Sequence, residues 1–172
     1  MSDKLLSNID LEHYCKKLEI PLISVGYKDH FENIEPVEGA YILNTESSYK
    51  GTGGTHWTCF CIKADYVMYF DSFGMSIPRE IKEFIERYRP EFKIPVIYSI
   101  DQIQDMRSIN CGWFCIYFLY YTMVLGRYNL SYRILMNKHN AKYYNKNLIK
   151  NDKVIHQLIK EIFKMNKKYY VL

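Results

Sequence analysis

The feature that most constrains the fold of this chain is the apolar run CGWFCIYFLYYTMVL, residues 111–125. It is shorter than the roughly 18 to 20 apolar residues that a membrane-spanning helix needs, and it holds three tyrosines. Gly126 follows it directly, and glycine is the residue that most often ends a helix. We therefore expect a buried core helix that begins at Cys111 and is ended by Gly126.

A cysteine at the start of a helix is a candidate nucleophile. Unpaired backbone N–H groups and the positive end of the helix dipole both favour the thiolate over the thiol at that position. Buried cysteines at helix starts are also common as inert core residues. Cys111 is therefore a catalytic candidate only if the rest of the sequence supplies its partners.

Length and composition indicate an ordinary globular protein. With 172 residues, of which 48% are hydrophobic and 24% charged, we expect one domain, residues 1–172, with a sizeable core. The net charge of +4 permits contact with nucleic acid or an acidic surface without requiring it. Five cysteines and the polar N-terminal sequence MSDKLLSNID argue against a secreted disulfide framework, so we expect a reducing intracellular compartment.

Three further helices are predicted by apolar residues at helical spacing. Their apolar faces are Leu11, Tyr14, Cys15 and Leu18; Ile81, Phe84, Ile85 and Tyr88; and Val154, Ile155, Leu158, Ile159, Ile162 and Phe163. Pro78 stands in the first turn of the second of these helices, and Pro90 closes it. The lysines near the end of the last helix are interpreted as a solvated helix end, with nucleic-acid contact as the alternative: Lys160, Lys164, Lys167 and Lys168.

Short β-branched and aromatic runs predict strands over residues 39–45 and 94–99. Two more apolar runs, 57–63 and 66–70, are joined by Ala64 and Asp65, which is typical of a tight hairpin. Residues 22–38 are expected to form an irregular connection, and residues 127–150 are ambiguous. Because strands and helices interleave without regular βαβ alternation, the predicted class is α+β.

The predicted hairpin places two chemically important side chains together. His56 begins one strand and Asp71 ends the next. In an antiparallel hairpin the first residue of one strand lies beside the last residue of its partner, so His56 and Asp71 should be close. The alternative for Asp71 is a turn-capping role beside Ser72 and Gly74.

Together these residues can supply the parts of a nucleophilic cysteine site. Such a site needs a thiolate, an imidazole, a group that orients the imidazole, and donors for the oxyanion. Cys111 is the thiol, His56 the imidazole, and Asp71 the orienting acid. The oxyanion donors are the backbone N–H of Cys111 and the side-chain amide of Gln104, for which Gln102 is the rival.

The strings GTGGTHW, YFDSFG and QDMRSINCGWFC resemble the His, acidic and Gln/Cys motifs of the adenovirus-type maturation proteases. These belong to a wider group of cysteine peptidases that includes the SUMO-specific proteases and shares the order His, acid, Gln, Cys. LISVGYKDHF, GAYILNTESS and the C-terminal helix also resemble adenoviral counterparts, so the resemblance covers nearly the whole chain. It implies the papain-like, adenain-like fold, a central mixed sheet flanked by helices with the nucleophile at the N-terminus of a buried central helix.

The resemblance also implies roles for individual residues. His56, Asp71 and Cys111 match the triad, and Gln104 matches the oxyanion donor. Trp57 matches the aromatic residue that follows the catalytic histidine. The substrate-binding residues expected from these motifs are Trp57, Gly53, Gly54 and Gly112.

The implied activity is a cysteine endopeptidase that cuts virion precursor proteins after Gly-Gly or Gly-X motifs during particle maturation. Glycine suits a narrow cleft roofed by tryptophan, where side chains next to the scissile bond would clash. The resemblance implies a protein of the virion and of the host cytoplasm or nucleus. We expect a monomer with no membrane contact.

The sequence departs from the adenoviral pattern at two points. The acid is Asp71 where the adenoviral enzymes have Glu, as in the SUMO-protease branch. The cysteine that carries their disulfide-linked activating peptide has no counterpart near Lys93. No cofactor is required by the sequence, and activation by a viral peptide or by viral DNA stays open.

Three alternatives accompany this interpretation. The chain could be a peptidase that removes SUMO or ubiquitin-like tags, or an inactive module that binds Gly-Gly tails or DNA. The side chains of Cys59, Cys61, Cys115 and His56 could also be zinc ligands, but no CxxC pair with finger-like spacing is present. We therefore expect no metal, and expect these three cysteines and Cys15 to be core residues.

Overall fold

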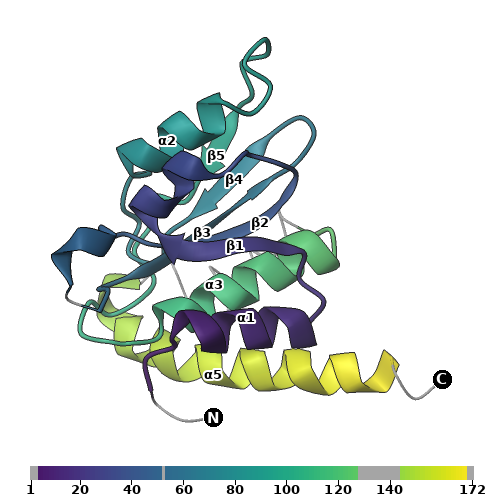
Figure 1. Cartoon of the computed structure of the whole chain (residues 1–172). Coiled ribbons are helices and arrows are strands. Elements are labelled where there is room, and N and C mark those ends of the chain that lie inside the picture. The colour runs from purple at the N-terminus through teal and green to yellow at the C-terminus, as the bar shows by residue number, and fades with distance from the viewer. Residues whose placement is uncertain (1–3, 52, 128–143, 170–172) are drawn as a thin grey trace.

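The computed structural model describes residues 4–51, 53–127 and 144–169 and shows a mixed sheet with helices on both faces (Figure 1). The strands are β1 (Leu22–Tyr27), β2 (Gly39–Asn44), β3 (Trp57–Ile62), β4 (Val67–Phe70) and β5 (Val96–Tyr98). The α-helices are α1 (Asn8–Lys17), α2 (Arg79–Glu86), α3 (Cys111–Leu119) and α5 (Tyr144–Tyr169).

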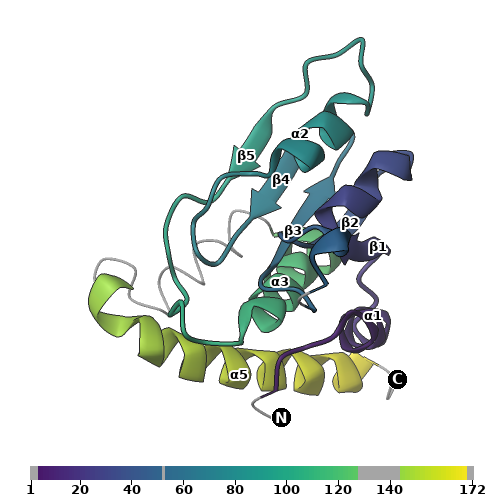
Figure 2. The same cartoon turned by 60° about the vertical axis from the view of Figure 1, so that its left-hand side comes forward.

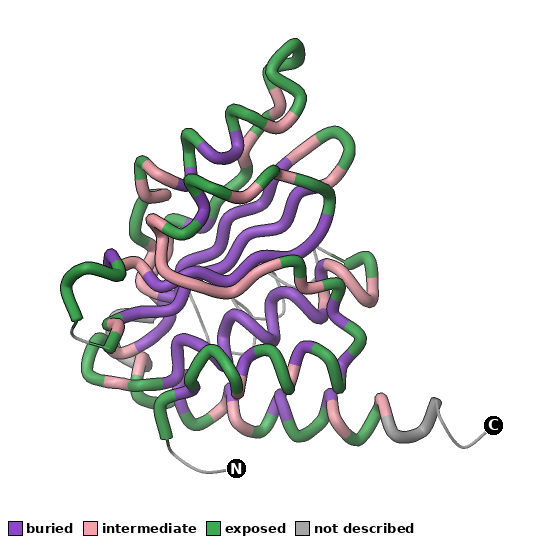
Figure 3. The backbone as a smooth tube through the Cα atoms, in the orientation of Figure 1, coloured by how far each residue is buried: buried purple, intermediate pink, exposed green. Residues whose placement is uncertain are grey.

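The sheet has the spatial order β1-β2-β3-β4-β5. The three central strands form an antiparallel meander, and each outer strand pairs in parallel with its neighbour. The burial view in Figure 3 shows β2, β3 and β4 as the most deeply buried strands, as their all-buried patterns confirm. The predicted α+β class with a central mixed sheet is therefore confirmed.

One face of the sheet packs against α2 and the 3-10 helix η1 (Lys28–Asn33). Phe84 of α2 makes edge-to-face contacts with Phe31 and Tyr41, at centroid distances of 5.5 and 5.4 Å. Tyr41 in turn stacks on Phe60 of β3 at 4.7 Å. Aromatic pairs of this geometry stabilise a core by about 0.5–1.5 kcal/mol each beyond their buried area.

The other face packs against α3, which is covered in turn by α1 and α5 (Figures 1 and 2). Every residue of α3 is buried, so this helix has no solvent face. That arrangement agrees with the buried central helix predicted from its apolar run. Among the described residues, no helix has both the length and the apolar character needed to cross a membrane.

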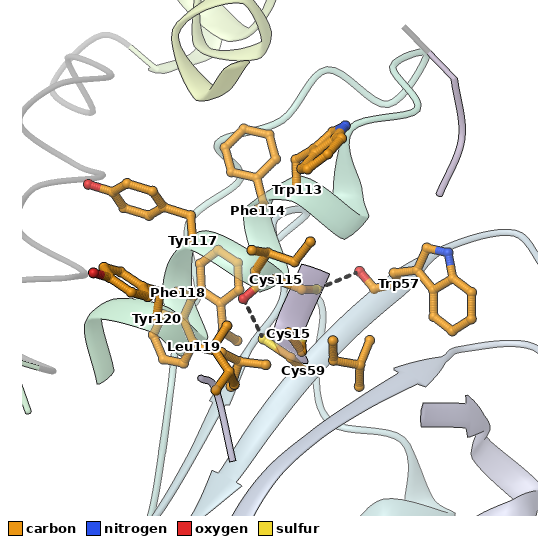
Figure 4. Close-up of a cluster of buried hydrophobic side chains, with 14 of the residues drawn as sticks. Cys15, Trp57, Cys59, Trp113, Phe114, Cys115, Tyr117, Phe118, Leu119 and Tyr120 are labelled. Carbon is orange, nitrogen blue, oxygen red and sulfur yellow. Dashed lines mark hydrogen bonds between the residues drawn. The ribbon is translucent and has the colours of Figure 1, made fainter. Parts of the chain in front are cut away.

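All five cysteines belong to this second core, and Figure 4 labels Cys15, Cys59 and Cys115. The Cys115 thiol donates to the carbonyl of Trp57 at 3.4 Å, and the Cys59 thiol points to the carbonyl of Cys115 at 3.9 Å. Cys15 and Cys61 are fully buried as well. Within the described part of the chain, no group of three His, Cys, Asp or Glu side chains could hold a metal ion.

The prediction for residues 22–38 was wrong, because this segment contains β1 and η1 instead of an irregular connection. β1 is an edge strand with one partner, β2, and its register shifts between Leu22 and Ser24. None of its residues is fully buried. An edge strand of this kind needs no continuous apolar run, so it carries little of the pattern by which strands are recognised.

The other predicted elements are confirmed with shifted ends. Residues 94–99 contain β5, and Pro78 precedes α2 as its N-cap residue. The helix that begins at Cys111 is α-helical to Leu119 and then continues as a π-helical turn over Tyr120–Val124. Gly126, with a φ of 61°, follows this turn as predicted.

The last helix, α5, also agrees with its predicted apolar face, since Ile155, Leu158, Ile159 and Ile162 are buried. Lys160 and Lys164 are exposed, whereas the side chains of Lys167 and Lys168 lie outside the described residues. Most of the ambiguous segment, residues 127–150, lies outside them too.

Candidate active site

The hairpin of β3 and β4 brings His56 and Asp71 together as predicted. His56 directly precedes β3 and Asp71 directly follows β4, whose Phe70 pairs with Cys59. His56 Nε2 lies 2.8 Å from Asp71 Oδ1. Both side chains are buried, so the contact is a hydrogen bond shielded from bulk water.

Asp71 is fixed by a tight turn as well as by the histidine. Its Oδ1 also accepts the backbone N–H of Phe73 at 2.7 Å, and its carbonyl accepts the N–H of Gly74 at 3.0 Å. Ser99 Oγ bonds both the N–H and the carbonyl of Asp71. The turn-capping role and the orienting role are therefore combined in one carboxylate.

Phe73 covers the imidazole from one side. Its ring stacks on His56 with a centroid distance of 4.0 Å and an angle of 15° between the planes. The stack and the bond to Asp71 together fix both the tilt and the rotation of the imidazole. Nδ1 is left as the ring nitrogen that faces away from the carboxylate.

Cys111 is the second group, after Asp71, that acts on the imidazole, since its thiol also raises the pKa of His56. Nδ1 is buried and, within the described residues, has no hydrogen-bond partner of ordinary geometry. Burial of His56 disfavours its protonation, but Asp71 and the neighbouring Cys111 outweigh this effect and raise its pKa from 6.5 to about 9. At neutral pH the site therefore favours a protonated imidazole beside the sulfur, the charge state that stabilises a thiolate.

Cys111 opens α3, with Asn110 as the N-cap residue. As the first residue of a helix, Cys111 has a backbone N–H without an intrahelical partner. The side chain is only 2% exposed. The nucleophile candidate thus lies at a helix start, beside the imidazole and nearly closed off from solvent.

Gln104 lies in the loop before α3 and is fully buried. Its Oε1 accepts from Ser72 Oγ at 2.5 Å, next to Asp71 in sequence. Its Nε2 donates to Ser108, to the carbonyl at 3.1 Å and to Oγ at 2.9 Å. The Gln104 amide is therefore already hydrogen-bonded, while the rival Gln102 donates from Nε2 to the carbonyl of Gln104 at 3.0 Å.

Trp57, Gly53 and Gly54 line a pocket of about 300 Å³, whose lining residues do not include His56, Asp71, Cys111 or Gln104. The remaining lining comes from the N-terminal segment, the start of α1, β1, β2 and the loop before β3: Leu5, Leu6, Ser7, Asn8, Gly26, Tyr27, Asn44 and Thr55. Trp57 is held in place because its Nε1 donates to the carbonyl of Leu6 at 2.8 Å.

Gly112 does not line this pocket. A Cβ at this position would lie 3.2 Å from side-chain atoms of Leu6 and of Leu11. The glycine therefore allows α3 to approach the N-terminal segment and α1. The structure places Gly112 in the packing beneath the site, whereas Trp57, Gly53 and Gly54 lie together at the pocket.

Sequence reasoning missed several residues of the site. The stack of Phe73 on His56 could have been suspected from the aromatic residue two positions after Asp71, since the turn places it near the ring. Ser72 and Ser108, which hold Gln104, gave no recognisable pattern. Asp152 of α5, which accepts from Ser108 Oγ at 2.5 Å, is remote in sequence and gave none either.

The five-stranded mixed sheet with its flanking helices is a fold that also occurs in a solved protease structure. The ASFV pS273R protease shares this fold, with a TM-score of 0.54 and 16% identity over 76% of this chain and 61% of that chain. The fold predicted from the motif resemblance is thereby confirmed. The matched region spans less than two thirds of the length of the viral protease.

Two other solved structures align with lower scores. The SUMO protease Ulp1, with its catalytic cysteine oxidised to a sulfinic acid, gives a TM-score of 0.47 at 11% identity, covering 93% of this chain and 80% of that chain. ChlaDub1 from Chlamydia trachomatis gives a TM-score of 0.36 at 16% identity, covering 87% of this chain and 78% of that chain. No family model matches the sequence, and the curated proteins contain no significant match.

Proposed function

We propose that this chain is a cysteine endopeptidase that uses Cys111 as nucleophile, His56 as general acid and base, and Asp71 as the orienting acid. The observation that carries the proposal is the 2.8 Å bond from His56 Nε2 to Asp71, which leaves Nδ1 for the Cys111 sulfur. The raised pKa of His56, about 9, supports a protonated imidazole at neutral pH.

In the proposed reaction the Cys111 thiolate attacks the scissile carbonyl carbon, and its π electrons move to the oxygen to form an oxyanion. The backbone N–H of Cys111 donates to that oxygen. When the tetrahedral intermediate collapses, the C–N bond breaks and His56 gives its Nδ1 proton to the leaving amine. A water molecule, deprotonated by His56, then hydrolyses the thioester and releases the acid and the Cys111 thiolate.

The second oxyanion donor is proposed to be the Gln104 amide. Its Nε2 lies on Ser108 in the free protein, so one of its two N–H groups turns from the Ser108 carbonyl to the oxyanion. Gln104→Ala is then expected to lower kcat on the order of 10²–10³, whereas Gln102→Ala keeps the wild-type value. The reverse pattern would move the role to Gln102.

We further propose that the substrates are viral precursor proteins cut after Gly-Gly or Gly-X sites during virion maturation. The motif resemblance and the fold shared with a viral protease support this choice. The pocket lined by Trp57, Gly53 and Gly54, the neighbours of His56 in sequence, supports a site for small residues of the substrate. The site of action would be the virion and the infected cell.

An activator, if one is used, is proposed to bind without a covalent link. All five cysteines of the chain are buried, so none offers a surface thiol for a disulfide-tethered peptide. Adding a viral peptide or DNA to the purified protein and measuring kcat/KM tests whether either activates it. Loss of the activation under reducing conditions would contradict non-covalent binding.

The decisive experiment compares wild-type and Cys111→Ala protein on candidate particle proteins and maps the new N-termini by mass spectrometry. Cuts after glycine in capsid or core precursors, absent with the variant, support the proposal. Cleavage confined to the tails of ubiquitin-like modifiers would instead support the tag-removing alternative. Cleavage that persists with Cys111→Ala would eliminate the cysteine mechanism, and the folded state of the variant is checked by circular dichroism.

A further inference from the structure

The loop that carries Gln104 and ends at Cys111 is held from outside by one short stretch of α5. Asn151 and Asp152 are buried residues of that helix, 0% and 8% exposed. Asn151 Nδ2 donates to the carbonyl of Ile103 at 2.7 Å. Both side chains are polar, and neither faces the apolar core that the rest of the buried α5 face contacts.

The Asp152 carboxylate makes three contacts with this loop. Oδ1 accepts from Ser108 Oγ at 2.5 Å and from Asn110 Nδ2 at 3.1 Å, and Oδ2 accepts the backbone N–H of Asp105 at 3.2 Å. Burial raises the pKa of Asp152, while these three bonds oppose that effect. A buried carboxylate with several donors aimed at it is expensive to desolvate and is expected to fix the geometry around it.

Two of these contacts lead directly to the reacting groups. Asn110 is the N-cap residue of α3, one position before Cys111. Ser108 Oγ, which donates a hydrogen bond to Asp152, accepts one from Gln104 Nε2 at 2.9 Å. The hydrogen bonds continue from Gln104 Oε1 to Ser72 Oγ, next to Asp71.

We propose that Asp152 is a positioning residue that fixes Gln104 through Ser108 and the start of the nucleophile helix through Asn110. Because the Ser108 hydroxyl donates its hydrogen bond to the carboxylate, it can only accept a hydrogen bond from Gln104. That orientation keeps one N–H of Gln104 on the Ser108 hydroxyl, while the other, which bonds the Ser108 carbonyl in the free protein, turns to the oxyanion. Asn151 supports the same loop through Ile103. This inference rests on the peptidase function proposed above.

The test is a double-mutant cycle between Asp152→Ala and Gln104→Ala, with kcat and KM measured for a peptide substrate. If Asp152 acts through Gln104, Asp152→Ala lowers kcat on the order of 10-fold to 10²-fold with KM within about 3-fold. In the Gln104→Ala background the same change lowers kcat by a clearly smaller factor, the part that acts through Asn110. Losses that multiply in the double variant would overturn the proposal.

Leu158→Ala is the matched control, because Leu158 is also buried on α5 but packs in the apolar core. It is expected to reduce stability while keeping kcat near the wild-type value below the unfolding transition. A kcat loss as large as that of Asp152→Ala would reduce the Asp152 effect to general helix destabilisation and overturn the proposal.

Ser108→Ala keeps the test decisive even where Asp152→Ala fails to fold. It removes the hydroxyl that joins Gln104 to Asp152 but leaves the bonds from Asn110 and Asp105 to the carboxylate. We expect a kcat loss that is again non-additive with Gln104→Ala. Full activity of Ser108→Ala would overturn the link through the serine.

Hydrogen exchange separates this inference from the proposed function. In Asp152→Ala, amides of residues 103–110 should exchange faster than in wild-type protein or in Leu158→Ala, whether or not any peptide is cleaved. Unchanged exchange there would refute the positioning role of Asp152. Faster exchange in Asp152→Ala, combined with a wild-type protein that cleaves nothing, would refute the peptidase function alone.

Discussion

At the scale of single residues, one imidazole decides the charge state of the site. Burial alone would keep His56 neutral at physiological pH, yet its pKa is raised to about 9 by Asp71 and Cys111. The folded protein therefore holds this proton more tightly than the unfolded chain does. The corresponding contribution to stability is fully present below the ordinary histidine pKa and is lost as the pH rises through about 9.

Asp71→Asn tests this balance through the pH dependence of kcat/KM. In wild-type protein the alkaline limb should have its midpoint near pH 9, where the imidazolium loses its proton. The variant lacks the carboxylate that raises the pKa of His56, so the limb should move to lower pH. We expect kcat at neutral pH to fall by up to roughly 10⁴-fold, the scale that an orienting acid has in hydrolase triads. An alkaline limb at the same pH would contradict the role of Asp71.

Selective alkylation tests whether Cys111 is the reactive thiol. Burial raises the pKa of Cys15 to about 12 and of Cys61 to about 11, and it also raises those of Cys59 and Cys115. Iodoacetamide at neutral pH should therefore modify Cys111 alone, as read by peptide mass spectrometry. His56→Ala should slow this reaction. Equal labelling of a core thiol in folded protein would argue against a specially activated Cys111.

At the scale of elements, the His56–Asp71 pair could be predicted because two apolar runs and a two-residue connection fix the register of a hairpin. The hydrogen bond between Ser108 and Asp152 could not be predicted, because Asp152 lies 44 residues after Ser108 and no pattern in residues 127–150 links them. Phe73 lies between these cases, since its turn is local but its stack on the imidazole depends on the side-chain direction. β1 was missed because none of its residues is fully buried, so the segment shows no continuous apolar run.

The loop before β3 offers a matched pair of glycine substitutions. Gly53 and Gly54 both have positive φ, 80° and 91°, so alanine is strained at either position. At Gly53 a Cβ meets nothing within 4 Å, whereas at Gly54 it collides with the side chain of Asn44. Asn44 Oδ1 accepts the N–H of Thr55 at 3.2 Å, next to His56.

Gly54→Ala should therefore destabilise the protein more than Gly53→Ala and should lower kcat/KM further. Each alanine costs about 1–2 kcal/mol for the left-handed backbone, and displacement of Asn44 adds to this at Gly54 alone. Urea unfolding and peptide hydrolysis measure the two effects. Equal losses at the two positions would show that the Asn44 contact has no bearing on the site.

At the scale of the whole molecule, the candidate catalytic groups belong to the most deeply packed part of the fold. Cys111 starts a helix with no exposed residue, and His56 and Asp71 flank the central hairpin. Regions with many buried contacts open only with free energies close to that of global unfolding. The groups are therefore expected to stay assembled until the protein as a whole unfolds.

Heat inactivation and unfolding should accordingly share one midpoint. Phe84→Ala removes the aromatic centre of the core on the opposite face of the sheet. It should reduce the free energy of unfolding by about 3–5 kcal/mol and so lower both midpoint temperatures together. Its kcat below the transition should match wild type, because Phe84 touches none of the site residues. Residual activity and circular dichroism measured over one temperature series check this. Activity lost well before the fold would contradict the expectation.

The complete burial of α3 limits how the proposed peptidase can be regulated. A nucleophile whose supporting helix cannot fray has no low-energy inactive form produced by local melting. Control of the proposed peptidase must then act on access to Cys111 and His56 from outside the helix. Inhibitors should accordingly succeed by blocking that access, since the buried helix leaves no second conformation for a ligand to select.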